Sequence, residues 1–414
     1  MNAAELGPVP PERRTQPAFD LFLIFAGANI VATTLVTGAS LASTFGTREA
    51  LALIGLGSFG GAAFVAALAP VGPRLGVPSV VAARAALGTR GATLVALFLY
   101  VTNFAWIAIN TVIAASACAA VAGGPASERF WALGLGLLVP LVVAGGPRLV
   151  ALADRVAVPL LLALGLAMTV MCLRLPREIL AGPGTGGLHW IRGLDVVIAY
   201  QVSWILMFAD YSRYTASAAR GAWAVFLGLG LTSLWFMSLG FLSARAASSS
   251  DPAAMLAAIG LGGVGGALLI ALASLTTNFV NVYLSALAWR SLLPRSGERA
   301  AVWIAGGVGT ALGLLSRVWL ERYADFMLVL GTTLVPVGGV LLARFFLVAR
   351  EVDVARLYEP PRGLGVSFAG LLAWALGAVV YGLPGIWGGT VPSLATATLT
   401  YAALDRAAGA GRSR

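Results

Sequence analysis

One polar stretch inside a long apolar segment carries the side chains best suited to bind a solute. Residues 261–288 contain no charged residue, yet the run from Ala271 to Tyr283 bears six hydroxyl or amide side chains: Ser274, Thr276, Thr277, Asn278, Asn281 and Tyr283. In hydrocarbon each such group needs a hydrogen-bonding partner, because no water is present. The stretch is therefore either a set of contacts between helices or part of a solute pathway.

Helical spacing indicates what chemistry this stretch offers. A helix brings Ala273, Thr276, Thr277 and Asn281 close to one face. Their neutral oxygen atoms suit a weakly held hard cation, and the amide suits a polar uncharged ligand. Two adjacent threonines together with two asparagines favour a solute pathway over helix packing alone.

The composition places this stretch in an all-α integral membrane protein. Of the 414 residues, 59% are hydrophobic and 11% are charged, whereas soluble domains carry roughly a quarter charged residues. The mean hydropathy is +0.89, and many apolar runs reach the length of about 20 residues that a membrane helix needs. The lipid bilayer is therefore the first expected partner.

Hydropathy predicts twelve membrane spans in a single transporter domain over residues 19–404. The spans are 19–44, 49–72, 92–122, 128–146, 155–174, 194–212, 222–247, 261–288, 300–316, 323–348, 364–383 and 385–404. Residues 78–90 are predicted to form a short cytoplasmic or re-entrant helix. Residues 1–18 and 405–414 are predicted to be cytoplasmic tails.

The positions of the arginines predict the orientation of these spans. All 27 basic residues are arginine, and the net charge is +10. With the N-terminus inside, the cytoplasmic loops and tails hold 19 arginines and the outer loops hold 8. Because positive residues accumulate on the cytoplasmic side, both termini are predicted to be cytoplasmic in the inner (cell) membrane. This pattern explains the basic charge better than nucleic-acid binding does.

Spans one and six carry polar residues near their centres. Asn29 interrupts span one, and Tyr200, Gln201 and Ser203 interrupt span six. The two spans are five apart, which fits two inverted repeats of five helices whose first helices are broken at mid-membrane. Repeat one covers about 19–174 and repeat two about 194–348, with two extra helices over 364–404. A pair of kinked packing helices is the alternative reading of these two spans.

Two tryptophans predict the kind of solute. Span three contains Asn103, Trp106, Asn110 and Thr111, and Trp106 and Asn110 share a helical face. Trp106 and Trp204 of span six both fall near mid-membrane, although membrane tryptophans usually lie at the interfaces. Two indoles with amides nearby predict a slot for a flat heterocycle, with the rings stacking and the amides bonding its edge.

Ionisable residues are nearly absent from the span centres. Asp20, Asp195 and Asp325 lie at span starts, Asp210 lies at a span end, and the single histidine, His189, lies in a loop. Proton pumps use buried ionisable chains, so sodium coupling is expected, with a proton as the alternative. No nucleophile–base pair, phosphate loop or metal cluster indicates an enzyme, and neither tail holds a signalling domain.

Several motifs resemble the nucleobase–cation symporter-1 family of cytosine, hydroxymethylpyrimidine and hydantoin transporters. They are Val81–Gly91, the Asp210-Tyr-Ser-Arg-Tyr214 segment, Thr276-Thr-Asn278, and Val335–Val340 followed by Arg344–Val348. The resemblance implies a LeuT-like transporter of 5+5 inverted-repeat architecture, with two further C-terminal helices. It also implies import of a neutral, pyrimidine-like heterocycle by sodium symport with alternating access. An amino-acid or other small-solute symporter of the same fold is the alternative, and no obligate protein partner is expected.

The same resemblance assigns residues to two sites. For the substrate, Trp106 would stack on the ring, Asn110 would bond its edge, and Ser203 and Trp204 would flank it. Further substrate candidates are Asn29, Gln201, Asn278 and Asn281. Sodium would bind the hydroxyls of Thr276 and Thr277 and the carbonyls of Ala26, Asn29 and Ala273. Val282 and Ile30 stand where the hydantoin relative has polar pocket residues, so the substrate is expected to differ.

Overall fold

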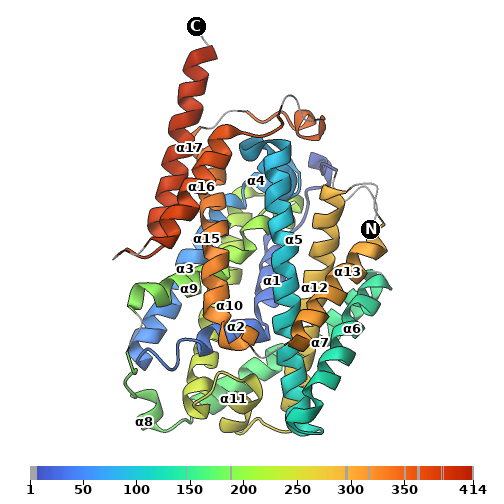
Figure 1. The fold of residues 1–414 in the computed structure, drawn as a ribbon, viewed down its shortest axis with the longest axis vertical. Coiled ribbons are helices and arrows are strands. Elements are labelled where there is room, and N and C mark those ends of the chain that lie inside the picture. Colours follow the sequence, from blue (N-terminus) through green and yellow to red (C-terminus); the bar gives the residue numbers. More distant parts are fainter. Residues whose placement is uncertain are drawn as a thin grey trace.

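The chain folds into one bundle of long helices (Figure 1). The structure is a computed structural model that describes residues 7–145, 147–186, 189–293, 297–315, 318–348, 351–360, 364–383, 385 and 387–412. Within these ranges every regular element is a helix, and one isolated bridge pairs Gln16 with Thr215. In Figure 1, α4 (Val71–Leu75) lies at the upper end of the bundle, and α8 (Arg177–Leu180) and α11 (Pro252–Ala258) lie at the lower end.

Eight helical segments of the described chain are long and apolar enough to cross a membrane, and one bent pair makes a ninth. The eight are Thr47–Leu75 (α3 and α4), Ser79–Val121 (α5), Pro125–Ala144 (η3 and α6), Arg155–Cys172 (in α7), Trp190–Met207 (α9 and η4), Ala218–Ala247 (α10), Val264–Ala286 (in α12) and Tyr323–Leu347 (α15 and η6). Two shorter apolar helices are Arg299–Leu315, within α13 (Glu298–Leu315), and α16 (Phe368–Gly382). A multi-pass membrane protein is therefore confirmed, while the count of twelve spans and the two repeats stay predictions.

The last helix extends into the predicted C-terminal tail. The helix α17 runs from Thr390 to Arg412, so residues 405–412 of the predicted tail continue a helix. Alanine has the highest helix propensity, and its frequency near this end accounts for the continuation. Residues 413–414 lie outside the described residues.

Span one is broken at mid-span, as the sequence predicts. The helices α1 (Ala18–Asn29) and α2 (Ala32–Ala39) meet at a bend of 60°. Val31 adopts an extended conformation, with φ −140° and ψ 163°. The hydroxyl of Thr34 donates to the carbonyl of Asn29 at 2.6 Å, which satisfies one of the groups that the break frees.

Span six changes its helix type and is not interrupted. The helix α9 (Trp190–Val202) passes into the 3-10 helix η4 (Ser203–Met207), and Ser203 keeps helical angles of φ −56° and ψ −25°. The predicted open break is therefore wrong for this span. No glycine or proline stands at the junction, and the Ser203 hydroxyl donates to the Tyr200 carbonyl at 2.6 Å.

The predicted helix over 78–90 is present as the first part of α5. Gly88 separates it from span three, with φ 76° and ψ 167° inside the merged element. Positive φ favours glycine, and a Cβ at this position would meet the backbone of residues 365–367. The Ser367 amide donates to the Leu87 carbonyl at 2.8 Å, so the segment before α16 closes the kink.

Glycines hold four of the spans in close contact. A Cβ at Gly38 of α2 would overlap the Met237 carbonyl of α10, and one at Gly240 would overlap the Leu35 carbonyl of α2. At Gly61 of α3, a Cβ would meet the Gln201 side chain of α9 at 2.5 Å. Close approach through glycine is a common way to pack membrane helices. Spans one, two, six and seven therefore form one tightly packed group.

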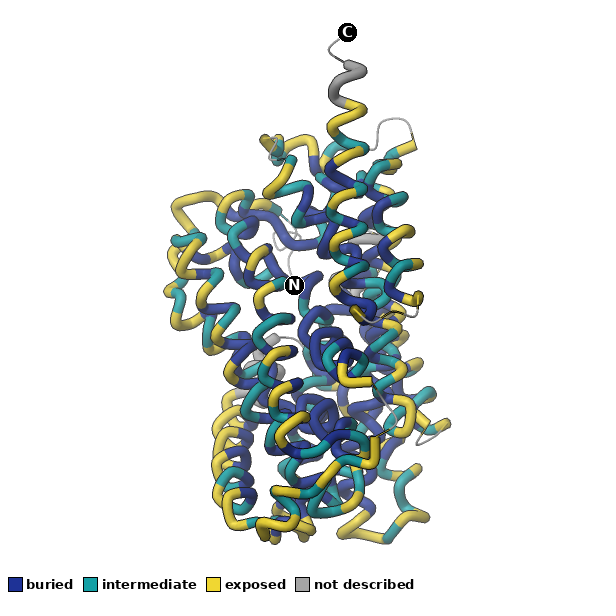
Figure 2. Tube along the Cα trace, turned by 90° about the vertical axis from the view of Figure 1, so that its left-hand side faces the viewer, coloured by how far each residue is buried: buried dark blue, intermediate teal, exposed yellow. Residues whose placement is uncertain are grey.

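Buried residues lie in the centre of the bundle, and exposed residues lie along its outside (Figure 2). Large apolar side chains on α7, among them Leu160, Leu162 and Leu166, are 43–56% exposed. An outer surface of this composition fits hydrocarbon in place of water.

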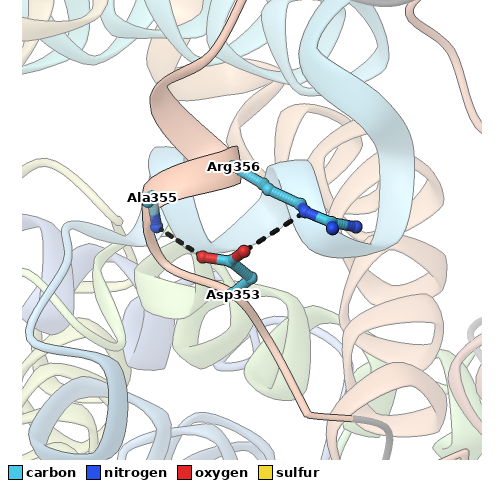
Figure 3. Close-up of polar contacts among 3 residues, drawn as sticks. All are labelled: Asp353, Ala355 and Arg356. Carbon is cyan, nitrogen blue, oxygen red and sulfur yellow. Dashed lines mark hydrogen bonds and ion pairs between the residues drawn. The ribbon is translucent and has the colours of Figure 1, made fainter.

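The upper end of the bundle is held by backbone contacts and by one capped turn. The N-terminal segment lies there, with the Val9 amide donating to the Gly76 carbonyl at 2.8 Å. Figure 3 shows the turn before η7 (Ala355–Tyr358): Asp353 accepts from the Ala355 amide at 3.0 Å and pairs with Arg356 at 3.2 Å. Arg84 of α5 donates to the Leu357 carbonyl at 2.8 Å, which fixes this turn on the upper part of α5.

Candidate functional site

A cavity of about 370 Å³ lies where the broken span meets α5, α9 and α12. Its lining residues come from far-separated parts of the chain: Leu23, Ile24, Gly27, Ala28, Val31, Thr33, Leu99, Asn103, Trp106, Val158, Leu161, Tyr200, Ser203, Trp204, Met207, Tyr211, Thr276, Thr277, Val280, Asn281 and Leu284. None of these described lining residues carries a charge. The cavity therefore suits an uncharged, partly apolar ligand.

Both predicted indoles border this cavity. The ring of Trp106 packs edge-on against Tyr200, Tyr323 and Phe326, with centroids 5.2–6.4 Å apart. The ring of Trp204 meets Phe25 of α1 edge-on at 6.3 Å. Edge-to-face packing fixes each ring, so the two indoles are held as walls of one cavity.

Four of the predicted polar residues also line the cavity, namely Ser203, Thr276, Thr277 and Asn281. The hydroxyls of the two threonines donate to carbonyls of their own helix: Thr276 to Leu272 and Ala273 at 3.0 and 3.1 Å, and Thr277 to Ala273 at 2.8 Å. A hydroxyl that donates in this way keeps lone pairs for a second partner. The threonine oxygens can thus still serve as ligands from the cavity wall.

Asn29 and Gln201 do not line the cavity in this conformation, and their role as substrate contacts stays a prediction. Both are fully buried, and both amide nitrogens donate to the Leu229 carbonyl of α10, at 3.2 and 3.4 Å. Asn29 also donates to Thr232 at 3.1 Å and to Ser233. These two side chains tie the mid-membrane parts of spans one and six to span seven.

Asn110 and Asn278 are likewise turned away from the cavity. The amide of Asn110 donates to the Trp106 carbonyl at 2.9 Å, one turn earlier on α5. The amide of Asn278 reaches across to α5, donating to the Ile107 carbonyl at 3.1 Å and to Thr111 at 3.3 Å. In this conformation Asn278 fastens α12 to α5, and neither asparagine contacts the cavity. The predicted contact of Asn110 with the edge of the substrate therefore stays a prediction that this conformation does not show.

The three carbonyls predicted to bind sodium are engaged within the chain. The Ala26 carbonyl accepts from the Ile30 amide at 3.1 Å, the Asn29 carbonyl accepts from Thr34, and the Ala273 carbonyl accepts from both threonines. Ala26 and Ala273 are buried behind the cavity wall, while their neighbours Gly27 and Thr277 line it. The donor set is neutral oxygen only, which fits a weakly held sodium ion. Among the described residues no cluster of histidine, cysteine or carboxylate offers a different metal site.

Hydrogen bonds seal the cavity toward the lower end of the bundle. The Tyr323 hydroxyl of α15 lies 2.8 Å from the Thr37 hydroxyl and donates to the Thr33 carbonyl at 3.2 Å, both on α2. Toward the upper half, the lining residues Leu23 and Val158 are 51% and 43% exposed. The contacts of Tyr323 therefore close the cavity between α15 and α2, and its two most exposed lining residues lie on α1 and α7.

Some residues of the cavity wall were not predicted from the sequence as site residues. Asn103 lies three residues before Trp106 on α5, so helical spacing alone places it on the same face. Tyr211 also borders the cavity, within the Asp210–Tyr214 motif. Tyr323 and Phe326 stack around Trp106 from a helix more than 200 residues away in the sequence, and no local pattern in the sequence indicates that pairing.

Comparison with known proteins places this site in a family. A family model described as a permease for cytosine/purines, uracil, thiamine and allantoin matches residues 8–402. The chain is 31% identical over 243 residues to a putative purine-cytosine permease, YxlA, of Bacillus subtilis. That match covers 56% of this chain and about half of the relative, 52%. The chain is also 24% identical over 404 residues to a cytosine permease of Escherichia coli, covering 93% of this chain and 90% of the relative.

Two solved structures share the fold. The inward facing conformation of Mhp1 matches with a TM-score of 0.87 at 20% identity, over 99% of this chain and 94% of that one. A closed conformation of Mhp1, a nucleobase-cation-symport-1 family transporter with bromovinylhydantoin bound, matches with a TM-score of 0.82, over 98% and 95% of the two chains. Since the family model covers nearly the whole chain and both structures share its architecture, this protein belongs to the family of permeases for cytosine/purines, uracil, thiamine and allantoin, a family of membrane transporters and not of enzymes.

Proposed function

We propose that the protein imports a small uncharged heterocycle of the cytosine or hydroxymethylpyrimidine type by symport with sodium. The observation that carries this proposal is the uncharged cavity walled by Trp106 and Trp204. Indole walls bind a flat ring through its faces, and the few polar groups between them fix its orientation. The relatives named as cytosine permeases support the same class of substrate.

Sodium is the proposed coupling ion. Thr276 and Thr277 present hydroxyl oxygens on the cavity wall, and the carbonyls of Ala26, Asn29 and Ala273 lie on the two helices that border it. A proton would need an ionisable side chain on the pathway. Among the described lining residues none is acidic or basic, so a sodium ion fits this wall better than a proton does.

Transport would proceed by alternating access. The group formed by spans one, two, six and seven is packed through glycines, and the cavity lies between this group and α5 and α12. A rigid group of this kind can rock about a central site in an inverted-repeat carrier. The excess of arginines assigns the upper end to the cytoplasm. With the lower end sealed by Tyr323, the conformation would then be inward facing, with both termini cytoplasmic in the inner membrane.

Uptake into proteoliposomes tests the proposal. Labelled cytosine, uracil and hydroxymethylpyrimidine are offered with an inward sodium gradient, with a proton gradient, and with neither. We expect uptake of at least one ring to require sodium. Uptake that ignores sodium but follows the proton gradient would refute sodium coupling, and uptake of none of the rings would refute the substrate class.

A paired substitution tests the cavity itself. Trp106→Phe removes an indole from the wall, while Trp374→Phe removes one from α16, where the indole nitrogen donates to the Thr333 carbonyl at 3.0 Å. We expect only the first change to weaken uptake. Competition by amino acids tests the alternative substrate class, whose carboxylate needs a cationic partner or a helix N-terminus. The described lining residues include no arginine, but the N-terminus of α2 borders the cavity at Val31 and Thr33.

A further inference from the structure

Span six carries one buried carboxylate that does not belong to the cavity. Asp195, near the start of α9, is 2% exposed. Its two oxygens accept the backbone N–H groups of Gly389 and Thr390 at 2.8 and 3.0 Å, where α17 begins. Among the described residues no ion pair includes Asp195, although Arg192 lies one turn earlier on the same helix. The helix start offsets part of the charge, but buried charges in proteins are usually paired or coordinate a metal ion.

Three hydroxyl groups at the same junction of helices also lack a partner. They belong to Tyr381 at the end of α16 and to Thr390 and Ser393 in the first turn of α17, and all three side chains are at most 1% exposed. Each hydroxyl oxygen is buried and has no hydrogen-bonding partner among the described residues. Native proteins leave few such groups. Three of them at one junction indicate that something other than the protein supplies the missing partner.

The packing of α16 beside α17 brings these groups toward the carboxylate (Figure 1). The Tyr381 hydroxyl lies near both the Asp195 carboxylate and the Thr390 hydroxyl, without reaching hydrogen-bonding geometry with either. Thr390 and Ser393 are three residues apart, so they share a face of α17. Gly388, with φ 68°, allows the close approach, because a Cβ there would meet an oxygen of Asp195 at 2.7 Å.

The chemistry of this oxygen set selects one class of ligand. A carboxylate has about four lone-pair positions, and the two backbone N–H groups occupy two of those of Asp195. The remaining positions and the three hydroxyl oxygens form a set of hard ligands with a single negative charge. Such a set suits an alkali cation, whereas calcium takes 6–8 oxygen ligands and soft metals prefer nitrogen or sulfur.

We propose that this set of one carboxylate and three hydroxyls, the α9–α17 site, binds a sodium ion or another alkali cation. The ion neutralises the Asp195 carboxylate and gives the three hydroxyl oxygens a common partner. It joins the start of span six to α16 and α17, which lie outside the two predicted repeats. The site is separate from Thr276 and Thr277 on the cavity wall, so its ion would stabilise the docking of α17 and would not be transported with the substrate.

Hydrogen exchange at the start of α17 tests the proposal, because the amides of Gly389 and Thr390 bond Asp195 directly. Exchange is followed by mass spectrometry on the purified full-length protein without substrate, in sodium, potassium or choline chloride of equal ionic strength. An ion that binds only the docked helix should slow exchange there by a factor of 1 + [ion]/Kd, which is about tenfold when the ion is at ten times its Kd. Protection by either alkali cation relative to choline supports the site, and equal exchange in the three salts would overturn it.

Four variants locate the effect. Tyr381→Phe and Thr390→Val should abolish the difference between sodium and choline, whereas Thr390→Ser, which keeps a hydroxyl oxygen, should retain it. The control Thr398→Val removes a hydroxyl of the same helix that donates to the Gly339 carbonyl at 3.2 Å, and it should retain the difference as well. Each comparison is made between salts within one variant, so a general loss of stability does not imitate the result.

A further variant separates this site from the proposed coupling ion. Thr277→Ala changes the cavity wall and should leave the protection of α17 by sodium intact. Protection that is lost in Thr277→Ala, or that persists in both Tyr381→Phe and Thr390→Val, would overturn the α9–α17 site. Neither result depends on which ring is transported, because no substrate is present.

Discussion

The seal formed by Tyr323 should set the balance between the two conformations of the protein. Its hydroxyl joins α15 to α2 through two contacts, at 2.8 Å with the Thr37 hydroxyl and at 3.2 Å with the Thr33 carbonyl. The side chain is 1% exposed, so water does not compete for these bonds. Opening the lower end separates α15 from α2 and breaks both. Tyr323→Phe therefore destabilises the closed lower end selectively.

The size of the effect follows from the two hydroxyl protons, one on Tyr323 and one on Thr37. They serve three contacts, because the Thr37 hydroxyl also donates to the Thr33 carbonyl, so two full hydrogen bonds are present in all. Tyr323→Phe removes one of them, which contributes about 1 kcal/mol. The Thr37 hydroxyl keeps its own bond to the Thr33 carbonyl at 2.8 Å, so no new unpaired donor remains there to enlarge the effect. Since about 1.4 kcal/mol is a tenfold change in an equilibrium constant, the population with an open lower end should rise about fivefold.

Thiol labelling measures this shift directly. A cysteine at Thr33, which lines the cavity behind the seal, is introduced after the buried Cys118 and Cys172 are replaced by alanine. A membrane-impermeant thiol reagent added from the side of the lower end should then label the Tyr323→Phe protein about fivefold faster, as long as the open population stays small.

The matched control removes a hydroxyl that makes no contact between α15 and α2. Tyr200 lies 2.6 Å from the Thr34 hydroxyl, and both residues belong to the packed group of spans one, two, six and seven. Tyr200→Phe should therefore leave the labelling rate within about twofold of the wild type, because its bond persists in both conformations. Equal labelling rates in Tyr323→Phe and the wild type would refute the seal, as would an equal acceleration by the two substitutions.

Three further substitutions have expected outcomes. Gly38→Ala should lower stability by about 2 kcal/mol or more, because its Cβ overlaps the Met237 carbonyl, whereas Gly60→Ala has nothing within 4 Å to meet; thermal melting in detergent compares them. Thr277→Ala should raise the sodium concentration needed for half-maximal uptake about tenfold, and Thr277→Ser, which keeps the hydroxyl, should not. Asp195→Asn should weaken the docking of the start of α17 by about 1–3 kcal/mol, since Asp195 is 2% exposed and accepts two backbone N–H groups there, at 2.8 and 3.0 Å. Faster hydrogen exchange at the start of α17 would show that loss, and unchanged exchange would contradict it.

The membrane fold could be predicted from hydropathy and residue spacing, because helices that cross lipid have a distinctly apolar composition. The break in span one was predictable from Asn29, and both indoles were predictable from their mid-span positions. The helix that precedes the kink at Gly88 was predictable from its lower hydropathy. In each case the cause is local, since a polar or glycine residue marks a departure from a regular apolar helix.

The direction of each buried amide was not predictable in the same way. Asn110 and Asn278 carry the side chain expected of a substrate contact, yet both point at carbonyls. One residue changes the direction of a helical side chain by about 100°, so the rotation of each helix about its axis decides which amide faces the cavity. That rotation is set by packing against neighbours far away in the sequence, as with Tyr323 beside Trp106.

The polar residues Asn29 of span one and Gln201 of span six share one hydrogen-bonding partner on span seven. Asn29 ends α1 at the break of span one, and Gln201 lies two residues before α9 becomes a 3-10 helix. Both amides reach the same Leu229 carbonyl of α10. One carbonyl therefore holds both places where the helices lose regularity and joins them through span seven. The amides that the sequence offers for binding thus differ in direction: those of Asn29 and Gln201 reach α10, that of Asn278 reaches α5, and Asn103 and Asn281 line the cavity.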